Sequence, residues 1–278
     1  MAADPKIVVS RDERVLTILI DRAEKLNALT SSMRTALFDA VREGDESDEV
    51  GCIVIKGAGS SFCAGADLAA DVTPRDGYLN DYDRSIQQDI RSLRRGEGYG
   101  SAVFWYSQTP IIAQVQGYCV AAGLELAMHC DFIVAAEDAK FGYPIVRNIA
   151  SPPSHMFTYL MGPQWTKYML YTGDYLDGTT AAAAGLALWA VPAGELDERV
   201  SALAHRIATV PPDLLAVNKA ICEKALDAMG RQLMQSLAIE ADAIAHKTPV
   251  MKKFYEIGKT EGFKAALEAI NRPYTNQQ

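Results

Sequence analysis

Three short apolar segments constrain the fold of this chain more than any other feature of its sequence. They read "VGCIVIKG" (50–57), "PIIAQVQG" (110–117) and "DFIVAAED" (131–138), and each ends in glycine or charged residues. Short apolar runs of this kind are typical of strands that are covered on both faces. The segment "AAGLELAMHC", which lies between the second and the third, begins a helix by its composition. This order of strand, helix and strand predicts an α/β fold with parallel strands joined by right-handed crossovers.

The flanking segments add further elements. Residues 6–20 are predicted to form two strands rich in β-branched residues, joined by a charged turn. Residues 30–48 predict a helix that begins after Thr30 or Ser31, because either hydroxyl can cap the first turn. Another helix is predicted around Tyr82–Leu93.

The second half of the chain is predicted to be mostly helical. From Pro152 onward the apolar residues recur at helical spacing. A first half rich in strands and a helical second half predict a core domain at residues 1–194 and a helical subdomain at residues 195–278.

Composition excludes several classes of protein. The chain has 278 residues and a formal net charge of −8 without a basic block, so we expect no nucleic-acid partner. No run approaches the roughly 18 apolar residues of a membrane span, so no membrane partner is expected. Five cysteines, an odd number with no C-x-x-C pair, indicate a reduced intracellular chain. Because "MAADPKIVVS" does not have the layout of a signal peptide, we expect a cytoplasmic protein.

The turn "KGAGSSFCAGADLAA" (56–70) is rich in glycine, and such turns let a ligand approach the backbone. Its glycines do not fit G-x-G-x-x-G, because position 62 is Phe, and no G-K-[ST] follows. The two common phosphate-binding loops are therefore excluded. No basic residue stands near Cys63, which we interpret as a small buried thiol. No group of residues has metal-ligand spacing, and we expect neither a metal nor a resident cofactor.

Glu125 is the only formally charged residue from Gly98 through Cys130. A carboxylate among apolar residues must be paired, protonated or functional, because burying it bare costs several kcal/mol. It lies in the first turn of the predicted helix, where the helix favours the anion and burial disfavours it. These opposed effects suit a group that exchanges protons near neutral pH, although a capping role explains the position as well.

Two strand-to-glycine turns about 55 residues apart can each offer free backbone amides, and amides from two loops can hold one oxyanion. The segments "FCAGADL", "QGYCVAAGLELAMHCD" and "AKFGYP" resemble the crotonase superfamily of enoyl-CoA hydratases and isomerases. The resemblance continues in "DRAEKLNALT", "YMLYTGDYLDGTTAAAAGL" and "TEGFKAALE" and covers most of the chain. It implies a crotonase-like (ClpP/crotonase) spiral of ββα units with a C-terminal helical trimerisation subdomain.

The resemblance also implies the site. The amides of Ala66 and Ala122 would hold the oxygen of an acyl-CoA thioester, and Glu125 would be the catalytic acid and base. The family often has Gly where this chain has Ala122, a mild departure because Ala keeps the amide. Around these groups the resemblance implies that substrate is bound by Ala64, Gly65, Asp67, Leu68, Gly123, Tyr143, Ile145, Arg147 and His155.

One departure from the family concerns the chemistry directly. Hydratases of the family use a second glutamate directly after "F-G-x-P", where this chain has Ile145, which cannot transfer a proton. His155 or Arg147 is a candidate substitute, although each also has an ordinary structural interpretation. The candidate roles of Arg147 are to hold a substrate carboxylate or to pair with Glu125, and its structural interpretation is an ordinary surface salt bridge.

Contacts to coenzyme A are implied for Arg22, Lys25 and Lys264, the last of which often serves a neighbouring subunit in the family. The resemblance further implies a homotrimer or a hexamer made of two trimers. The reaction expected first is hydration of a trans-2-enoyl-CoA, as in fatty acid metabolism. Alternatives are another crotonase chemistry, such as isomerisation, C–C cleavage or thioester hydrolysis, and an acyl-CoA-binding protein without turnover.

Overall fold

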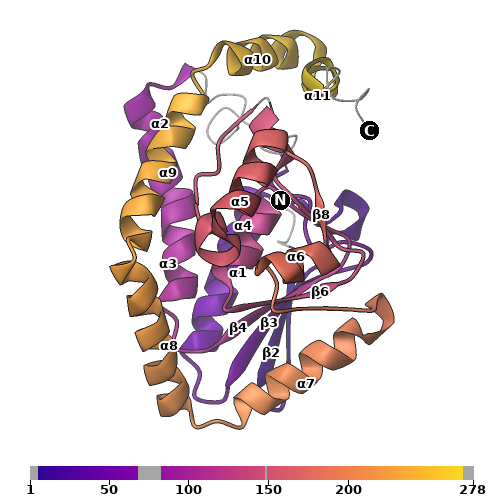
Figure 1. Cartoon of the computed structure of the whole chain (residues 1–278), viewed down its shortest axis with the longest axis vertical. Helices are drawn as coiled ribbons and strands as arrows, with labels where there is room; N and C mark the ends of the chain where they lie inside the picture. The colour runs from indigo at the N-terminus through magenta and orange to yellow at the C-terminus, as the bar shows by residue number, and fades with distance from the viewer. Residues whose placement is uncertain (1–5, 68–82, 148, 272–278) are drawn as a thin grey trace.

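The computed structural model describes residues 6–67, 83–147 and 149–271. In these residues a six-stranded sheet has the order β1-β2-β3-β4-β6-β9, and a three-stranded sheet has the order β5-β7-β8 (Figure 1). The strands are β1 (Ile7–Asp12), β2 (Val15–Ile20), β3 (Cys52–Gly57), β4 (Ile111–Val115), β5 (Tyr118–Val120), β6 (Phe132–Ala136), β7 (Lys140–Gly142), β8 (Leu176–Asp177) and β9 (Trp189–Val191). The α-helices are α1 (Ser31–Asp45), α2 (Ile86–Leu93), α3 (Tyr99–Trp105), α4 (Ala122–His129), α5 (Phe157–Thr172), α6 (Gly178–Ala184), α7 (Leu196–Ala208), α8 (Pro212–Ala228), α9 (Arg231–Ala245), α10 (Pro249–Glu261) and α11 (Phe263–Asn271).

The predicted parallel core is confirmed. The three apolar segments form β3, β4 and β6, which pair in parallel with one another. The strand β4 is buried along its whole length, as expected for a strand covered on both faces. Only β1 is antiparallel within the larger sheet, where it forms a hairpin with β2. The structure is thus the expected α/β arrangement.

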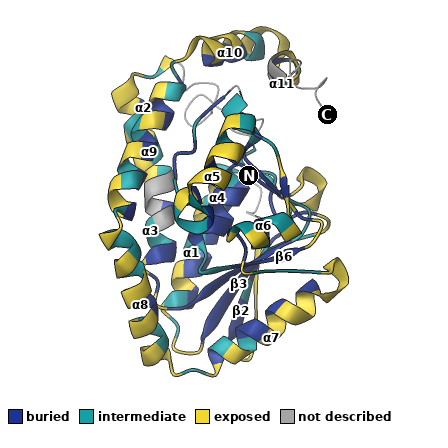
Figure 2. Ribbon diagram, in the orientation of Figure 1, coloured by how far each residue is buried: buried dark blue, intermediate teal, exposed yellow. Residues whose placement is uncertain are grey.

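Helices cover both faces of the larger sheet. Figure 1 shows α7 on one side of the strands and α1 and α4 on the other, and Figure 2 shows that the strands between them are dark blue, hence buried. The helix α1 begins as predicted, because the hydroxyl of Thr30 accepts a hydrogen bond from the amide of Met33.

The helices α8 and α9 run along one side of the molecule, and α9 lies beside α2 (Figure 1). An ion pair between the buried Lys219 and the partly buried Asp131 joins α8 to the sheet. Lys219 donates to Asp131 at 2.8 Å, to the hydroxyl of Ser107 at 2.8 Å and to the carbonyl of Thr109 at 3.0 Å. These three acceptors precede β4 or β6, so one ammonium group holds a distant helix against two strand ends.

The helices α10 and α11 form a small second hydrophobic cluster. Met251, Phe254 and Tyr255 of α10 pack there with Ile149, and the half-buried Ile145 contacts both this cluster and the main core. The C-terminal helices therefore pack against the segment that follows β7.

Two parts of the fold were not predicted. The smaller sheet was missed because its strands have only two or three residues. The sequence "RRGEGYGSAVFWY" was not predicted to be helical, yet it contains α3. The division at residue 195 stays a prediction; α7, which follows it, packs against the sheet. Among the described residues, no helix is long and apolar enough to cross a membrane.

The ion pair of Lys219 gives a stability prediction. Replacing Lys219 by Met removes the cation from the partly buried Asp131, which keeps its hydrogen bond from the amide of Ile111, and we expect the free energy of unfolding to fall by about 1–3 kcal/mol. Urea denaturation followed by circular dichroism measures this change. The matched control is Lys224→Met on the exposed side of the same helix, for which we expect less than about 0.5 kcal/mol. Equal effects of the two substitutions would contradict the anchoring role.

Candidate active site

The glycine-rich turn after β3 lies directly against the turn after β4. The amide of Phe62 donates to the carbonyl of Gln116 at 2.7 Å, and the amide of Cys63 donates to the carbonyl of Tyr118 at 2.9 Å. The amide of Val120 donates back to the carbonyl of Cys63 at 3.1 Å. The two turns that the sequence singled out are therefore paired, although they are about 55 residues apart.

Two glycines allow this close approach. A Cβ atom on Gly123 would lie 2.4 Å from the carbonyl oxygen of Cys63, which is closer than any real contact. Gly65 has φ +101°, and a Cβ atom there would lie 3.2 Å from the Cβ of Ala121 and 3.6 Å from the amide nitrogen of Ala122. The backbone before Ala66 thus lies beside the first residue of α4.

The amides of Ala66 and Ala122 have no hydrogen-bond acceptor within the described part of the chain. The bridge between Leu29 and the first turn uses the carbonyl of Gly65 and the amide of Asp67, each at 2.8 Å, and does not use the amide of Ala66. Ala122 begins α4, where amides have no acceptor within the helix. These two amides lie on adjacent turns, and neither donates a hydrogen bond to another group of the described residues.

Glu125 lies one turn further along α4 and is 2% exposed. Every residue of α4 from Gly123 to His129 is buried, so the carboxylate lies in an apolar environment, as its sequence context predicts. The hydroxyl of Tyr143 donates a hydrogen bond to Oε1 of Glu125 at 2.7 Å. Tyr143 is itself 1% exposed, and its ring packs edge to face on Phe157. The resemblance implied that Tyr143 binds substrate, and the sequence did not indicate its contact with the carboxylate of Glu125.

The segment after Tyr143 places Ile145 and Arg147 in a short 3-10 helix. Ile145 is half-buried among apolar side chains. Arg147 donates to the carbonyl of Thr172 at 2.6 Å and to Asp174 at 2.7 Å. The ion pair of Arg147 with Asp174 and its hydrogen bond to Thr172 thus hold the C-terminal end of α5.

The two histidines near the site have different surroundings. His155 lies at the start of α5, where its ring is 3.0 Å from the hydroxyl of Thr158, and partial burial lowers its pKa. His129 on α4 is 2.8 Å from the hydroxyl of Ser154, and burial, followed by the charge of Arg231, lowers its pKa to about 3. His129 is therefore neutral at pH 7 and a weak base.

The sequence interpretation of Cys63 as a small buried thiol is confirmed, because its side chain is fully buried. Burial raises its pKa to about 12, so the reactive thiolate is not formed near neutral pH. Among the described residues, no group of three or more His, Cys, Asp or Glu side chains is placed to hold a metal ion.

The cations assigned to coenzyme A lie in two regions. Arg22 forms an ion pair with Asp67 at 2.6 Å and donates to the carbonyl of Ala28, beside the first turn. Lys25 is exposed in the same region. Lys264 on α11 is 92% exposed, and its ammonium is 3.9 Å from Glu268. Leu68, also assigned to the site, lies outside the described residues.

Asn27 was not recognised as a functional candidate. It is fully buried, and its amide nitrogen donates to the carbonyls of Ala58 and Ser61 at 2.8 and 2.7 Å. Its Oδ1 accepts from the amide of Arg22 at 2.9 Å. Asn27 thereby holds the Arg22 region against the glycine-rich turn. The sequence signal was an amide residue inside the otherwise apolar "LNAL".

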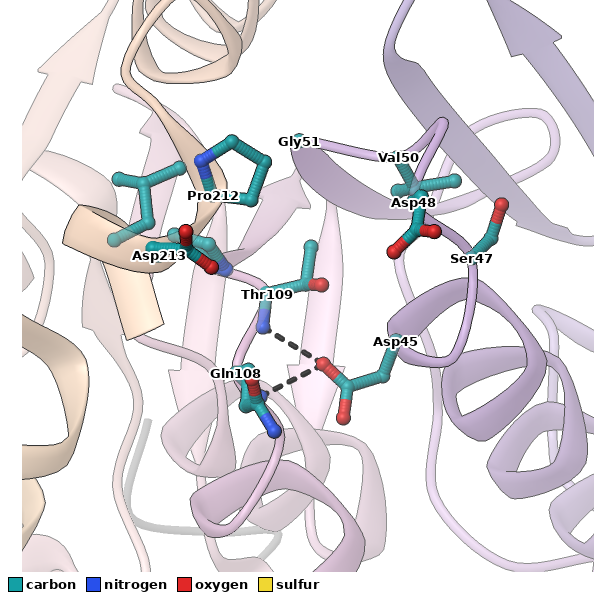
Figure 3. A pocket seen from close by; sticks show the side chains of 11 residues that line it. Asp45, Ser47, Asp48, Val50, Gly51, Gln108, Thr109, Pro212 and Asp213 are labelled. Carbon is teal, nitrogen blue, oxygen red and sulfur yellow. Dashed lines mark hydrogen bonds between the residues drawn. The ribbon is translucent and has the colours of Figure 1, made fainter. Parts of the chain in front are cut away.

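A separate hollow of about 110 Å³ lies at the other end of the strands (Figure 3). There Asp45 accepts hydrogen bonds from the amides of Gln108 and Thr109, both at 2.7 Å. Pro110, which also lines this hollow, directly precedes β4. Ligands of open α/β sheets bind at the carboxyl ends of the strands, where the two glycine-rich turns lie. The hollow in Figure 3 is therefore not the candidate active site.

A cavity of about 390 Å³ lies between α8 and the core. Its lining is largely apolar, and two ion pairs stand in its wall, Lys219 with Asp131 and Arg231 with Glu223. Because these charged groups already bond to one another, the cavity offers no acid and base like those at the paired turns.

Comparisons with known proteins agree with this geometry. A family model described as enoyl-CoA hydratase/isomerase matches residues 10–277. The crotonyl-CoA hydratase of Syntrophomonas wolfei is 30% identical over 246 residues, which cover 85% of this chain and 87% of that protein.

Solved structures are similar over nearly the whole chain. A crystal structure of an enoyl-CoA hydratase from Mycobacterium smegmatis has a TM-score of 0.88 at 31% identity and covers 98% of this chain and 96% of its own. An enoyl-CoA hydratase/isomerase from Xanthobacter autotrophicus Py2 has a TM-score of 0.87 at 27% identity, and the match covers 96% of this chain and 98% of that chain. The chain belongs to the enoyl-CoA hydratase/isomerase family and has the crotonase fold.

Proposed function

We propose that the protein is an enoyl-CoA hydratase, which adds water across the double bond of a trans-2-enoyl-CoA. The observation that carries the proposal is the buried carboxylate of Glu125 one turn after the paired glycine turns. Burial of this charge in an apolar helix is unfavourable. An acyl-CoA-binding protein would gain nothing from a carboxylate beside an oxyanion site.

The proposed mechanism uses three groups of this chain. The amides of Ala66 and Ala122 hold the thioester oxygen, and each such donor contributes about 3 kcal/mol to the transition state. Water attacks the β carbon while Glu125 takes one of its protons. The electron pair of the alkene forms a double bond between the α carbon and the carbonyl carbon. The electron pair of the carbonyl bond moves to the thioester oxygen, which gives an enolate. Glu125 then returns the proton to the α carbon, so that the product contains one added water and the carboxylate is regenerated.

A second candidate follows from Ile145. Its apolar side chain stands where the hydratases of the family have their second glutamate, so Glu125 must perform both proton transfers. Double-bond isomerisation needs one proton shuttle and the same enolate, which makes it the principal alternative. Cleavage of a C–C bond and hydrolysis of the thioester are further reactions that the oxyanion site would support.

The remaining assignments complete the proposal. Arg22, Lys25 and Lys264 contact coenzyme A. The chain around Gly65 and Gly123 lines the part of the site that holds the acyl group. The protein works in the cytoplasm on acyl-CoA and needs no cofactor beyond the coenzyme A of its substrate.

We also propose a trimer or a pair of trimers. Figure 2 shows many positions of α8 and α9 in yellow, hence exposed. Several of the exposed residues on these two helices are apolar. On α8 these are Leu214, Val217 and Ile221, and on α9 they are Leu233, Leu237 and Ile244. Such a surface is typical of a protein interface.

The oligomer is tested by light scattering after gel filtration. We expect three or six times the chain mass of 30.2 kDa, and Val217→Glu should lower that mass because it places a charge in the apolar surface. Arg206→Glu, at an exposed position of α7, is the matched control. A wild-type protein with the mass of one chain would contradict the proposal.

The function is tested with Glu125→Gln. We expect kcat with crotonyl-CoA and with a longer trans-2-enoyl-CoA to fall by at least about 100-fold, because the amide cannot transfer the proton. Mass spectrometry of the product separates hydration, which adds one water, from isomerisation, which leaves the mass unchanged. Glu137→Gln removes an exposed carboxylate and should keep the wild-type rate. A wild-type rate in Glu125→Gln would disprove the mechanism.

The pairing of the two turns is tested with Gly123→Ala. The added Cβ would meet the carbonyl of Cys63 at 2.4 Å and force the turns apart, so we expect kcat/KM to fall by about 100-fold as oxyanion donation is lost. Gly194→Ala is the matched control, because nothing lies within 4 Å of a Cβ there. Full activity in Gly123→Ala would show that the close approach is not needed for turnover.

A further inference from the structure

The hydrogen bond between Tyr143 and Glu125 joins two elements that the sequence does not connect. Glu125 belongs to α4, whereas Tyr143 follows β7, 18 residues later. The distance between the phenol oxygen and Oε1 is 2.7 Å, and both side chains are almost fully buried. A hydrogen bond to a charged acceptor is stronger than one between neutral groups, and burial strengthens it further.

Several contacts fix the position of the phenol. The ring of Tyr143 meets Phe157 edge to face, with ring centroids 5.7 Å apart. On its N-terminal side, Gly142 is held in the smaller sheet, where its carbonyl accepts from the amide of Ala121, the residue that precedes α4. On its other side, Pro144 restricts the backbone. The donor is therefore held in place before any substrate binds.

We propose that Tyr143 is a positioning residue that orients the carboxylate of Glu125 for proton transfer. A carboxylate has two oxygens, and holding Oε1 fixes the direction of Oε2. A fixed direction matters here because the same carboxylate must reach the attacking water and then the α carbon. The inference rests on the proposed role of Glu125. Tyr143 supplies a hydrogen bond to the carboxylate, which the apolar side chain of Ile145 cannot supply.

The hydroxyl also affects the charge of the carboxylate. A hydrogen bond donated to a carboxylate stabilises the ionised form, which is the form that takes the proton from water. Removing the donor makes protonation easier, so the ionised form is lost at a higher pH. The acid limb of the profile of kcat/KM against pH should therefore move to higher pH when the hydroxyl is removed.

The direct test is Tyr143→Phe, which keeps the ring and removes the hydroxyl. We expect kcat to fall by about 10- to 100-fold with little change in KM, because a small misplacement of a reacting group is costly and coenzyme A contacts are untouched. The acid limb should move to higher pH in the same variant. Tyr175→Phe is the matched control, because this ring packs beside Gly142 and is 40% exposed. It should keep both the rate and the profile.

A double-mutant cycle separates this inference from the proposed function. If Tyr143 acts through Glu125, Tyr143→Phe should cause no further loss in the Glu125→Gln background. A full further loss there would overturn the positioning role. If Glu125→Gln loses activity and Tyr143→Phe keeps the wild-type rate and profile, only the inference about Tyr143 fails. If Glu125→Gln keeps the wild-type rate, the proposed function fails first.

A second variant covers the case in which Tyr143→Phe does not fold, as judged by circular dichroism. Incorporation of 3-fluorotyrosine at position 143 keeps the size of the ring and makes the phenol a stronger donor. The acid limb should then move to lower pH, opposite to the effect of Phe. An unchanged limb in the folded fluorotyrosine protein would overturn the proposal.

Discussion

The backbone pairing between the turns after β3 and β4 is the interaction on which the rest of the site depends. Cys63 bonds through its amide and its carbonyl to the chain around Cys119, in the manner of one step of a parallel sheet. This pairing places Ala66 beside the start of α4, and α4 in turn places Glu125. Because backbone groups form the pairing, most side chains can change around it, but the glycines at the contact cannot.

The parallel strands and the selection of Glu125 as a candidate follow from short-range sequence signals. The strands β3, β4 and β6 were predictable because uninterrupted apolar runs need cover on both faces. Glu125 could be recognised as a functional candidate because a single carboxylate in a long uncharged stretch is costly to bury unless it is paired, protonated or functional. Neither signal requires knowledge of contacts between distant segments, which explains why both could be identified before the fold was known.

Contacts across the fold were not predictable in the same way. The helix α3 contains glycine, which disfavours helices, but Gly100 lets the ring of Phe38 approach where a Cβ would lie 2.4 Å away. Tertiary packing thus decides a segment that local propensity leaves open. The bond between Tyr143 and Glu125 joins residues that are separated in the chain by β6 and β7. The sequence motif "FGYP" shows that a tyrosine is present but not what its hydroxyl meets.

The shared packing of Ile145 has an evolutionary consequence. Its side chain contacts both the main core and the cluster that contains Met251 and Phe254 of α10. A mutation to glutamate at this position would bring a charge against that cluster, where it would be unfavourable without changes in the helix. The side chains of α10 therefore limit which residues the chain can accept at position 145.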